Sequence, residues 1–500
     1  MYKFIKWLGI TILAIIIVFF IAVVILANTI NPNRFKPLIT QQVYNATGRT
    51  LTINGDIHWS FFPSVGLNID QATLSNSDGF GSTPFATVKH LGIGIKVLPL
   101  LAKNVSTSDI TIDGLNINLM LNAANQNNWT FNQKNTPSNT QASATQTKST
   151  DTSSNAAYNF TFNIPRIDIK NSSLIWSDTS SGQKTEIKNI QLNVKNISFN
   201  NAFSTSFSCL INGKNPVLYG QFNLDGKTTL NVNNNSFDLL RNIKFDGKAV
   251  ISKFKANTFN IQTINAPISI NNGIITLSPI TGSLYQGKLN GDFQANMQQP
   301  KANINLQAQL SNISVQTLIA DMSGQKQYSG TLNMQTKLSA TGFDTFLNTL
   351  NGNASLNIKN GELTGFDLAY LIQSGRALLA GKPTPQQKGA NETDFGDLSA
   401  TAQIRNGIAT TNDLHITSQV YDVKGSGTTN LVTQQLNYEI DADLAGDASL
   451  DSPIPITITG KLSSPSVGLD MGKLLKNTVK HQINQQLNNV LDKFKSQLLQ

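Results

Sequence analysis

Charged residues are scarce in this chain of 500 residues: they make up 13% of the sequence, about half the usual share. Asparagine, threonine, serine and glutamine take their place, so we expect a surface that is polar but mostly uncharged. The net charge of +9 comes without a block of consecutive basic residues and without a basic helix interleaved with aromatic residues. The composition therefore argues against nucleic-acid binding and leaves a mild attraction to anionic membrane surfaces.

Cysteine and histidine are also rare, which limits the available chemistry. Cys209 is the single cysteine, so no intrachain disulfide can form, and we expect a small strand residue rather than a catalytic thiol. The four histidines lack the spacing of a metal site. Residues 226–228 (GKT) lack the first glycine of a phosphate loop and are interpreted as a turn, while Asp441 and Asp443 lack the glutamate that closes a calcium loop. We therefore expect no enzyme activity, no metal site and no cofactor.

One long apolar run stands at the start of the chain, in residues 8–27, flanked by Lys3 and Lys6. Its length suffices to cross a bilayer as a helix. A cleaved signal peptide is the alternative, but the apolar core is too long for one and no A-x-A-like cleavage site follows. Segment 1–30 is therefore predicted to be an uncleaved signal anchor, with an apolar face that includes Leu8, Ile12, Ile16, Phe20, Val24 and Ala27.

The anchor also predicts the location of the protein. Because only a very short segment precedes it, the large body that follows should be exported. In a bacterium, the protein would be a single-pass inner-membrane protein with its N-terminus in the cytoplasm and its bulk in the periplasm.

Alternation of apolar and polar residues dominates the rest of the chain. In residues 436–444 (LNYEIDADL) the even-numbered residues are apolar and the odd-numbered residues are polar or acidic. This period of two, punctuated by Asn-Gly pairs, is typical of half-buried antiparallel strands. Tight hairpins are predicted at the Asn-Gly pairs of residues 272–273, 290–291, 351–352, 360–361 and 406–407. Short helices are predicted at residues 32–44, 315–321, 344–350 and 367–379.

Two segments depart from the strand pattern. Residues 132–157 have almost no large apolar side chain, so they are predicted to be a disordered linker or a disordered loop inserted in the sheet. Residues 471–500 are predicted to form an amphipathic helix with lysines beside its apolar stripe. This helix either caps the end of the sheet or docks on a membrane surface or a partner.

Two sets of segments, in this order and behind the anchor, resemble the AsmA family of bacterial envelope proteins. The first set includes residues 47–67 (TGRTLTINGDIHWSFFPSVGL), residues 110–119 (ITIDGLNINL) and residues 127–131 (NNWTF). The second includes residues 360–372 (NGELTGFDLAYLI), residues 395–416 and residues 453–465 (PIPITITGKLSSP). The resemblance covers roughly the first quarter and the last third of the chain.

The resemblance implies a mainly β fold: a long, twisted antiparallel sheet curled into a hydrophobic groove, with an N-terminal transmembrane helix and a few short helices. It implies a role in outer-membrane assembly and in phospholipid movement between membranes, and it brings no catalytic residues. The predicted regions are the anchor (1–30), an N-terminal AsmA-like region (31–131), the linker (132–157), a central groove region (158–345), a C-terminal AsmA-like region (346–470) and the terminal helix (471–500).

Phospholipids and the inner membrane are the expected partners, with outer-membrane or periplasmic proteins as further ones. The residues predicted to line the lipid groove are Leu356, Ile358, Ile404, Leu436, Tyr438, Ile440 and Leu444. A pair of closed β-sandwiches would cover the same apolar faces with protein. The protein would then be a scaffold or assembly factor for outer-membrane proteins, and a hydrolase is the weaker third alternative.

Overall fold

The computed structural model describes residues 31–60, 65–95, 107–131, 163–198, 200–230, 239–387, 391–444 and 453–477, together with residues 479, 483, 486 and 487. Contacts divide the chain into two compact units, Met1–Asn235 and Ser236–Gln500. The described part of each is mainly β with few helices, as predicted. The predicted anchor (1–30) and linker (132–157) lie outside the described residues. Within the ranges given above, no helix combines the length and the apolar character needed to span a membrane.

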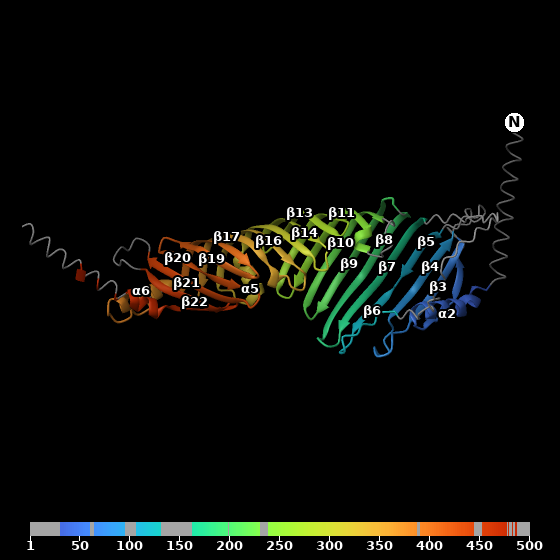
Figure 1. Ribbon diagram of the computed structural model, residues 1–500, viewed down its shortest axis with the longest axis horizontal. Helices are drawn as coiled ribbons and strands as arrows, with labels where there is room; N and C mark the ends of the chain where they lie inside the picture. Colours follow the sequence, from blue (N-terminus) through green and yellow to red (C-terminus); the bar gives the residue numbers. More distant parts are fainter. Residues whose placement is uncertain are drawn as a thin grey trace, which may run out of the picture. The chain divides into compact units, whose positions relative to one another are not determined.

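Unit 1 contains ten described strands, coloured blue to green in Figure 1. They are β1 (Leu51–Ile53), β2 (Ile57–Ser60), β3 (Val65–Leu74), β4 (Ala86–Ile95), β5 (Thr107–Asp113), β6 (Asn116–Leu121), β7 (Asn163–Asp178), β8 (Gln183–Ser198), β9 (Phe203–Lys214) and β10 (Val217–Leu230).

The sheet of unit 1 is mixed rather than purely antiparallel. β7 lies parallel to both β5 and β6, with Ile112 beside Ile169 and Leu119 beside Trp176. The predicted antiparallel pairing is wrong here. Parallel neighbours require a connection of about a dozen residues or more, and the chain between β6 and β7 is longer than that. The other pairings of the unit are antiparallel.

Unit 2 contains thirteen described strands, coloured from light green to red in Figure 1. They are β11 (Ile243–Ala256), β12 (Phe259–Asn271), β13 (Ile274–Leu284), β14 (Gly287–Asn296), β15 (Asn303–Ser314), β16 (Tyr328–Thr341), β17 (Asn351–Thr364), β18 (Glu392–Arg405), β19 (Ile408–Thr417), β20 (Tyr421–Asn430), β21 (Gln435–Leu444), β22 (Ile454–Lys461) and β23 (Ser464–Leu469). Each strand pairs antiparallel with the next along the chain, so this unit is the predicted antiparallel meander.

Two of the five predicted Asn-Gly turns are turns in the structure. Residues 272–273 join β12 to β13 and residues 406–407 join β18 to β19, and in both pairs both residues have positive φ. The other three predictions are wrong, since residues 290–291 lie within β14 and residues 351–352 and 360–361 lie within β17. A Cβ on Gly291 would lie 2.4 Å from the Gln307 carbonyl oxygen, so this glycine serves close approach of β15.

The helices are short: two precede β1 and the others lie between strands. They are the 3-10 helix η1 (Pro32–Phe35), α2 (Lys36–Thr47), α4 (Leu239–Asn242), α5 (Val315–Ser323), the 3-10 helix η2 (Leu347–Thr349) and α6 (Leu368–Leu379). The predicted helix at residues 344–350 is thus only a single 3-10 turn. Asp367 caps α6 by accepting a hydrogen bond from the Tyr370 N–H, and Ser314 caps α5 by accepting one from the Thr317 N–H.

The terminal helix begins at residue 471, as predicted. Leu474 is 2% exposed and packs in a core cluster with Ile440 and Ile456, so the first turn of this helix does cap the sheet. The predicted apolar stripe does not take part, since Leu475 is 61% exposed. Leu474, which precedes Leu475 of the predicted stripe, therefore makes the contact with the sheet that the stripe was expected to make.

Candidate functional site

One face of the unit 1 sheet is apolar across eight neighbouring strands, from β2 to β10. Strand pairing places a continuous row of side chains on this face, because partners opposite one another point to the same side. The row consists of Ile57, Ile69, Leu91, Ile112, Ile169, Leu192, Phe207 and Leu224. Ile57 is buried, whereas the other seven members are only half-buried.

Unit 2 carries apolar rows of the same kind. One row crosses seven strands, β12 to β18, and consists of Ile268, Leu277, Phe293, Leu306, Leu338, Gly352 and Ile404. A neighbouring row crosses β14 to β18 and consists of Leu289, Leu310, Met334, Leu356 and Ala400. The members of the second row are all half-buried. The two rows are thus apolar apart from Gly352, which has no side chain, and most of their members are only half-buried.

Helices cover part of the unit 2 face, and no second sheet packs on it among the described residues. Each of the five buried clusters joins neighbouring strands of one sheet, in two cases with a helix as well. α5 contributes Val315, Leu318 and Ile319 to a cluster over β12 to β17. α6 contributes Leu368 and Ile372 to a cluster over β19 to β23. The described residues therefore form open sheets with local helical covers, and not the closed sandwich considered as an alternative.

The residues predicted to line the groove all lie on this apolar face, in three different settings. Leu356 and Ile358 are half-buried beside the α5 cluster. Ile404 and Ile440 are each 6% exposed, within protein clusters, so they offer little surface to a ligand. The remaining predicted residues, Leu436, Tyr438 and Leu444, are half-buried.

The predicted residues do not include the other members of the two unit 2 rows or any member of the unit 1 row. The signal was available, since residues 303–310 (NINLQAQL) alternate strictly. Leu306 and Leu310 are half-buried members of the two unit 2 rows. Leu310 packs against the α5 cluster, whereas Leu306 belongs to none of the five clusters of the described residues, so Leu306 is a better candidate for ligand contact than Ile404 or Ile440.

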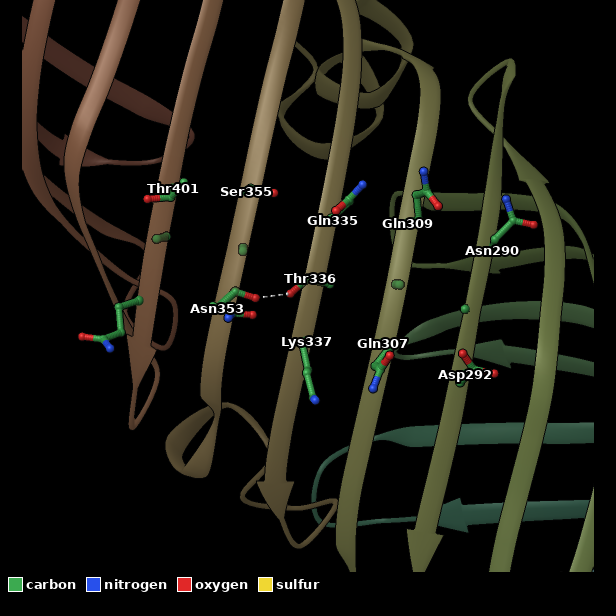
Figure 2. A pocket seen from close by; sticks show the side chains of 15 residues that line it. Asn290, Asp292, Gln307, Gln309, Gln335, Thr336, Lys337, Asn353, Ser355 and Thr401 are labelled. Atoms are coloured by element: carbon green, nitrogen blue, oxygen red, sulfur yellow. Dashed lines mark hydrogen bonds between the residues drawn. The ribbon is translucent and has the colours of Figure 1, made fainter.

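The opposite face of unit 2 is polar and hollowed. A depression of about 770 Å³ lies over β14 to β18 (Figure 2). Strand pairing aligns one row of its lining side chains, which consists of Asn290, Gln309, Gln335, Ser355 and Thr401. These side chains are uncharged, and Figure 2 shows them projecting from successive strands. Such a face suits contact with water and not with acyl chains.

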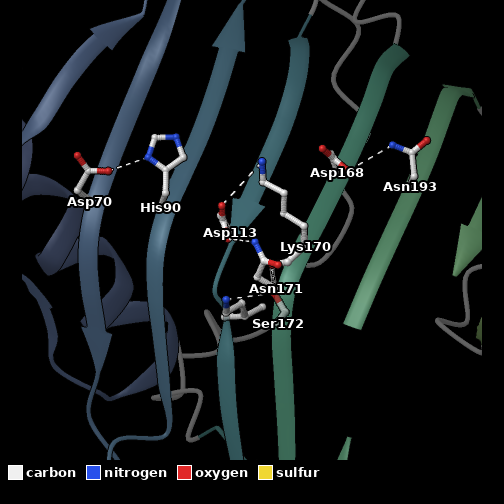
Figure 3. Close-up of polar contacts among 9 residues, drawn as sticks. Asp70, His90, Asp113, Asp168, Lys170, Asn171, Ser172 and Asn193 are labelled. Atoms are coloured by element: carbon white, nitrogen blue, oxygen red, sulfur yellow. Dashed lines mark hydrogen bonds and ion pairs between the residues drawn. The ribbon is translucent and has the colours of Figure 1, made fainter. Parts of the chain in front are cut away.

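Unit 1 has charged contacts on its polar face (Figure 3). Two of the four histidines meet at one carboxylate: His90 Nδ1 lies 2.7 Å from Asp70 Oδ1, and His58 Nε2 lies 3.5 Å from Asp70 Oδ2. Lys170 Nζ lies 3.8 Å from Asp113 Oδ2. The histidine pair could not be predicted from sequence spacing, because His58 lies on β2 and His90 on β4, and the two come together only at Asp70 on β3, the strand between them. No group of three or more potential metal ligands occurs among the described residues.

Three sequence features that could have indicated chemistry have structural roles instead. Cys209 is 9% exposed within β9, and burial raises the pKa of its thiol, as expected for a small packed residue. Residues 226–228, interpreted as a turn, lie instead inside β10, where they pair with residues 203–205 of β9. Asp441 and Asp443 lie on a strand, as predicted, and contact Lys473 (3.0 Å) and Arg376 (3.6 Å) respectively.

Comparison with known proteins shows the family of the chain. The sequence model of the AsmA family matches the chain twice, over residues 1–229 and 220–414. Among curated proteins, Protein AsmA of Escherichia coli (strain K12) is 25% identical over 109 residues, which are 22% of this chain and 17% of that relative. The chain thus aligns with less than a fifth of that relative. No solved structure matches it. The family match covers most of the chain, and the chain therefore belongs to the AsmA family.

Proposed function

We propose that this protein carries phospholipid acyl chains along the apolar faces of its sheets, between membranes of the bacterial envelope, and so supports outer-membrane biogenesis. The observation that carries the proposal is the continuous, half-buried apolar row that crosses strand after strand in each unit. An apolar face that the protein itself covers only in part suits contact with an apolar partner. Membership of the AsmA family supports a role in outer-membrane assembly.

The free energy of lipid desorption explains why such a face would be useful. Two acyl chains of roughly fifteen methylenes each cost on the order of 24 kcal/mol to move into water, at about 0.8 kcal/mol per methylene. A barrier of that height permits roughly one escape a day. A sheet that shields the chains while its polar face meets water lowers this barrier. The protein would act by binding alone, with no chemical step.

The location belongs to the same proposal. The apolar run of residues 8–27 is long enough for a single membrane-spanning helix and would hold the protein in the inner membrane, with both sheet units in the periplasm. This placement would put the apolar faces between the membrane that supplies lipid and the membrane that receives it.

The test compares two adjacent residues of β15 that point to opposite faces. Leu306 lies in the apolar row, whereas Gln307 is exposed on the polar face. We expect Leu306→Glu to lower phospholipid transfer between donor and acceptor vesicles about tenfold or more, because a buried carboxylate opposes passage of acyl chains. Gln307→Glu is the matched control and should transfer lipid normally.

Bound lipid and stability complete the experiment. The full-length wild-type chain should retain phospholipid that mass spectrometry detects, and Leu306→Glu should retain less. Urea unfolding of both variants must show that the sheet is intact. If the wild-type chain holds no phospholipid and Leu306→Glu transfers as fast as Gln307→Glu, the proposal is wrong.

A further inference from the structure

A continuous ridge of hairpin loops runs along one edge of the unit 2 sheet. We define the hairpin ridge by five loops, which connect β14 to β15, β16 to β17, β18 to β19, β20 to β21, and β22 to β23. They are residues 297–302, 342–350, 405–408, 431–434 and 461–463. Backbone hydrogen bonds link these loops in series: Gly342 N–H to Ala302 O, Gly407 N–H to Leu350 O, Leu431 N–H to Gly407 O, and Leu462 N–H to Gln434 O. The loops therefore form one surface rather than independent tips.

The ridge presents large apolar side chains to solvent although it has a core of its own. Leu350 and Ile404 are buried beneath it, with Phe346 and Leu431 packed against them. The outward side chains are Phe343 (59% exposed), Leu347 (44%), Ile408 (43%), Val432 (41%) and Leu462 (47%). Five exposed apolar residues on four consecutive hairpins form a patch that a soluble surface does not need.

The loops of the ridge approach one another closely. Gly407 has a φ of +76°, and a Cβ there would lie 2.3 Å from the Leu347 carbonyl oxygen and 3.0 Å from Val432 Cγ2. Only glycine permits both this backbone conformation and this spacing. The hairpins that carry Leu347, Ile408 and Val432 therefore approach one another closely at this turn.

Charge decides between the possible occupants. The ridge contains three exposed basic residues, Lys301, Arg405 and Lys461, and one acidic residue, Asp344. No ion pair joins any of these three basic side chains to another residue that the structure describes. Apolar side chains flanked by basic ones match the boundary between acyl chains and anionic headgroups in a lipid bilayer.

We propose that the hairpin ridge docks unit 2 on an anionic phospholipid surface, with its apolar tips inserted at the headgroup level. This goes beyond the proposed function, because it names the surface through which the protein meets a membrane. It does not depend on lipid moving along the sheet. A protein that only tethers membranes would use the same ridge.

The first measurement places a fluorescent label on the ridge of the full-length chain. Because Cys209 is the only cysteine, a Cys209→Ala background allows one label at a time, at Val432→Cys or at Val217→Cys. Val217, in unit 1, is a matched control with 45% exposure against 41% for Val432. The chain is held in nanodiscs, and vesicles containing phosphatidylglycerol and a quencher lipid are added. The label at position 432 should shift to shorter wavelength and lose about half of its emission or more, as a group at headgroup depth would; the label at position 217 should not change.

The second measurement removes the ridge chemistry. Leu347→Glu with Ile408→Glu should weaken vesicle binding about tenfold or more, since two apolar side chains no longer insert. Arg405→Gln with Lys461→Gln should weaken binding about fivefold per charge and reduce its salt dependence. Val420→Glu is the control, since Val420 is 49% exposed between β19 and β20, at the opposite ends of these strands.

Phospholipid retained by the variants separates this inference from the proposed function. Ridge variants should lose vesicle binding while they keep the phospholipid that co-purifies with the wild-type chain. The inference is overturned if the label at position 432 is indifferent to vesicles, or if the Leu347/Ile408 variant binds vesicles like the wild type. It is also overturned if the label shifts without vesicles in proportion to protein concentration, because a second copy of the chain would then cover the ridge.

Discussion

Arg49 is a buried charged residue in the described part of unit 1, and its contacts explain its position. Its guanidinium contacts the rings of Phe85 and Phe131, with Cζ 4.3 Å and 4.6 Å from the two ring centroids, and the two rings contact each other edge-to-face. Nη2 donates a hydrogen bond to the Asn128 carbonyl oxygen. Arg49 is 3% exposed, and burial lowers the pKa of its guanidinium. One side chain thus ties the end of α2 to the segment that follows β6.

Removing this guanidinium should destabilise unit 1. We expect Arg49→Met to lower the free energy of unfolding by about 3 kcal/mol, through loss of two cation–π contacts and a charged hydrogen bond. Urea unfolding measures the effect. Arg166→Met is the control: its Nη2 lies 2.7 Å from Asp109 Oδ2 at the surface, where an ion pair contributes about 1 kcal/mol or less. Equal losses in the two variants would show that the contacts of Arg49 with the two rings contribute nothing.

Asp178 gives the clearest prediction for pH. Hydrogen bonds from the Ser180 hydroxyl, then the Ser181 hydroxyl, lower the pKa of the Asp178 carboxyl from 3.8 to about 2. The lowered pKa means that the turn between β7 and β8 is stabilised fully above pH 3.8 and loses this contribution as the pH falls through about 2. Carboxyl NMR should show a titration midpoint near 2 for Asp178. Ser180→Ala should raise that midpoint more than Ser181→Ala does, and an unchanged midpoint in both variants would contradict the assignment.

Among the elements, α6 depends on a glycine for its contact with the sheet. Gly375 is buried in the helix, and a Cβ there would lie 2.7 Å from Ile454 Cγ2 and 3.3 Å from Leu469 Cδ2. We expect Gly375→Val to lift α6 from β22 and β23 and to cost about 1–3 kcal/mol of unfolding free energy. Gly468→Ala is the control, because nothing lies within 4 Å of its Cβ position. A Gly375→Val variant as stable as the wild type would mean that the helix is not seated by this contact.

The elements also show how far sequence reasoning reaches. Period-two alternation predicted the strands and the face on which Leu356 and Tyr438 lie, because alternation follows directly from strand geometry. It could not predict the parallel pairing of β7 with β5 and β6, since partner choice depends on a crossover through residues 122–162. It could not separate an open sheet from a sandwich either, because both bury the same residues. What covers Ile440 is α6, and only tertiary packing reveals it.

For the molecule as a whole, the central question is which side of the sheets meets lipid. Neighbouring residues of one strand answer it, because they share backbone, depth and sequence context and differ only in face. Pairs suited to the test are Leu306 with Gln307, Leu356 with Ser355, and Ile169 with Lys170. The first member of each pair is half-buried on the apolar face, and the second is exposed on the polar face.

A photoreactive amino acid placed at each of these six positions, one at a time, should give phospholipid adducts in cells at Leu306, Leu356 and Ile169, and few or none at their neighbours. Adducts in both units would mean that lipid occupies the rows of unit 1 as well as those of unit 2. Adducts confined to one unit would restrict the proposal to that unit's sheet. Equal labelling within each pair would contradict it, since only a face-specific ligand can distinguish side chains one residue apart along a strand.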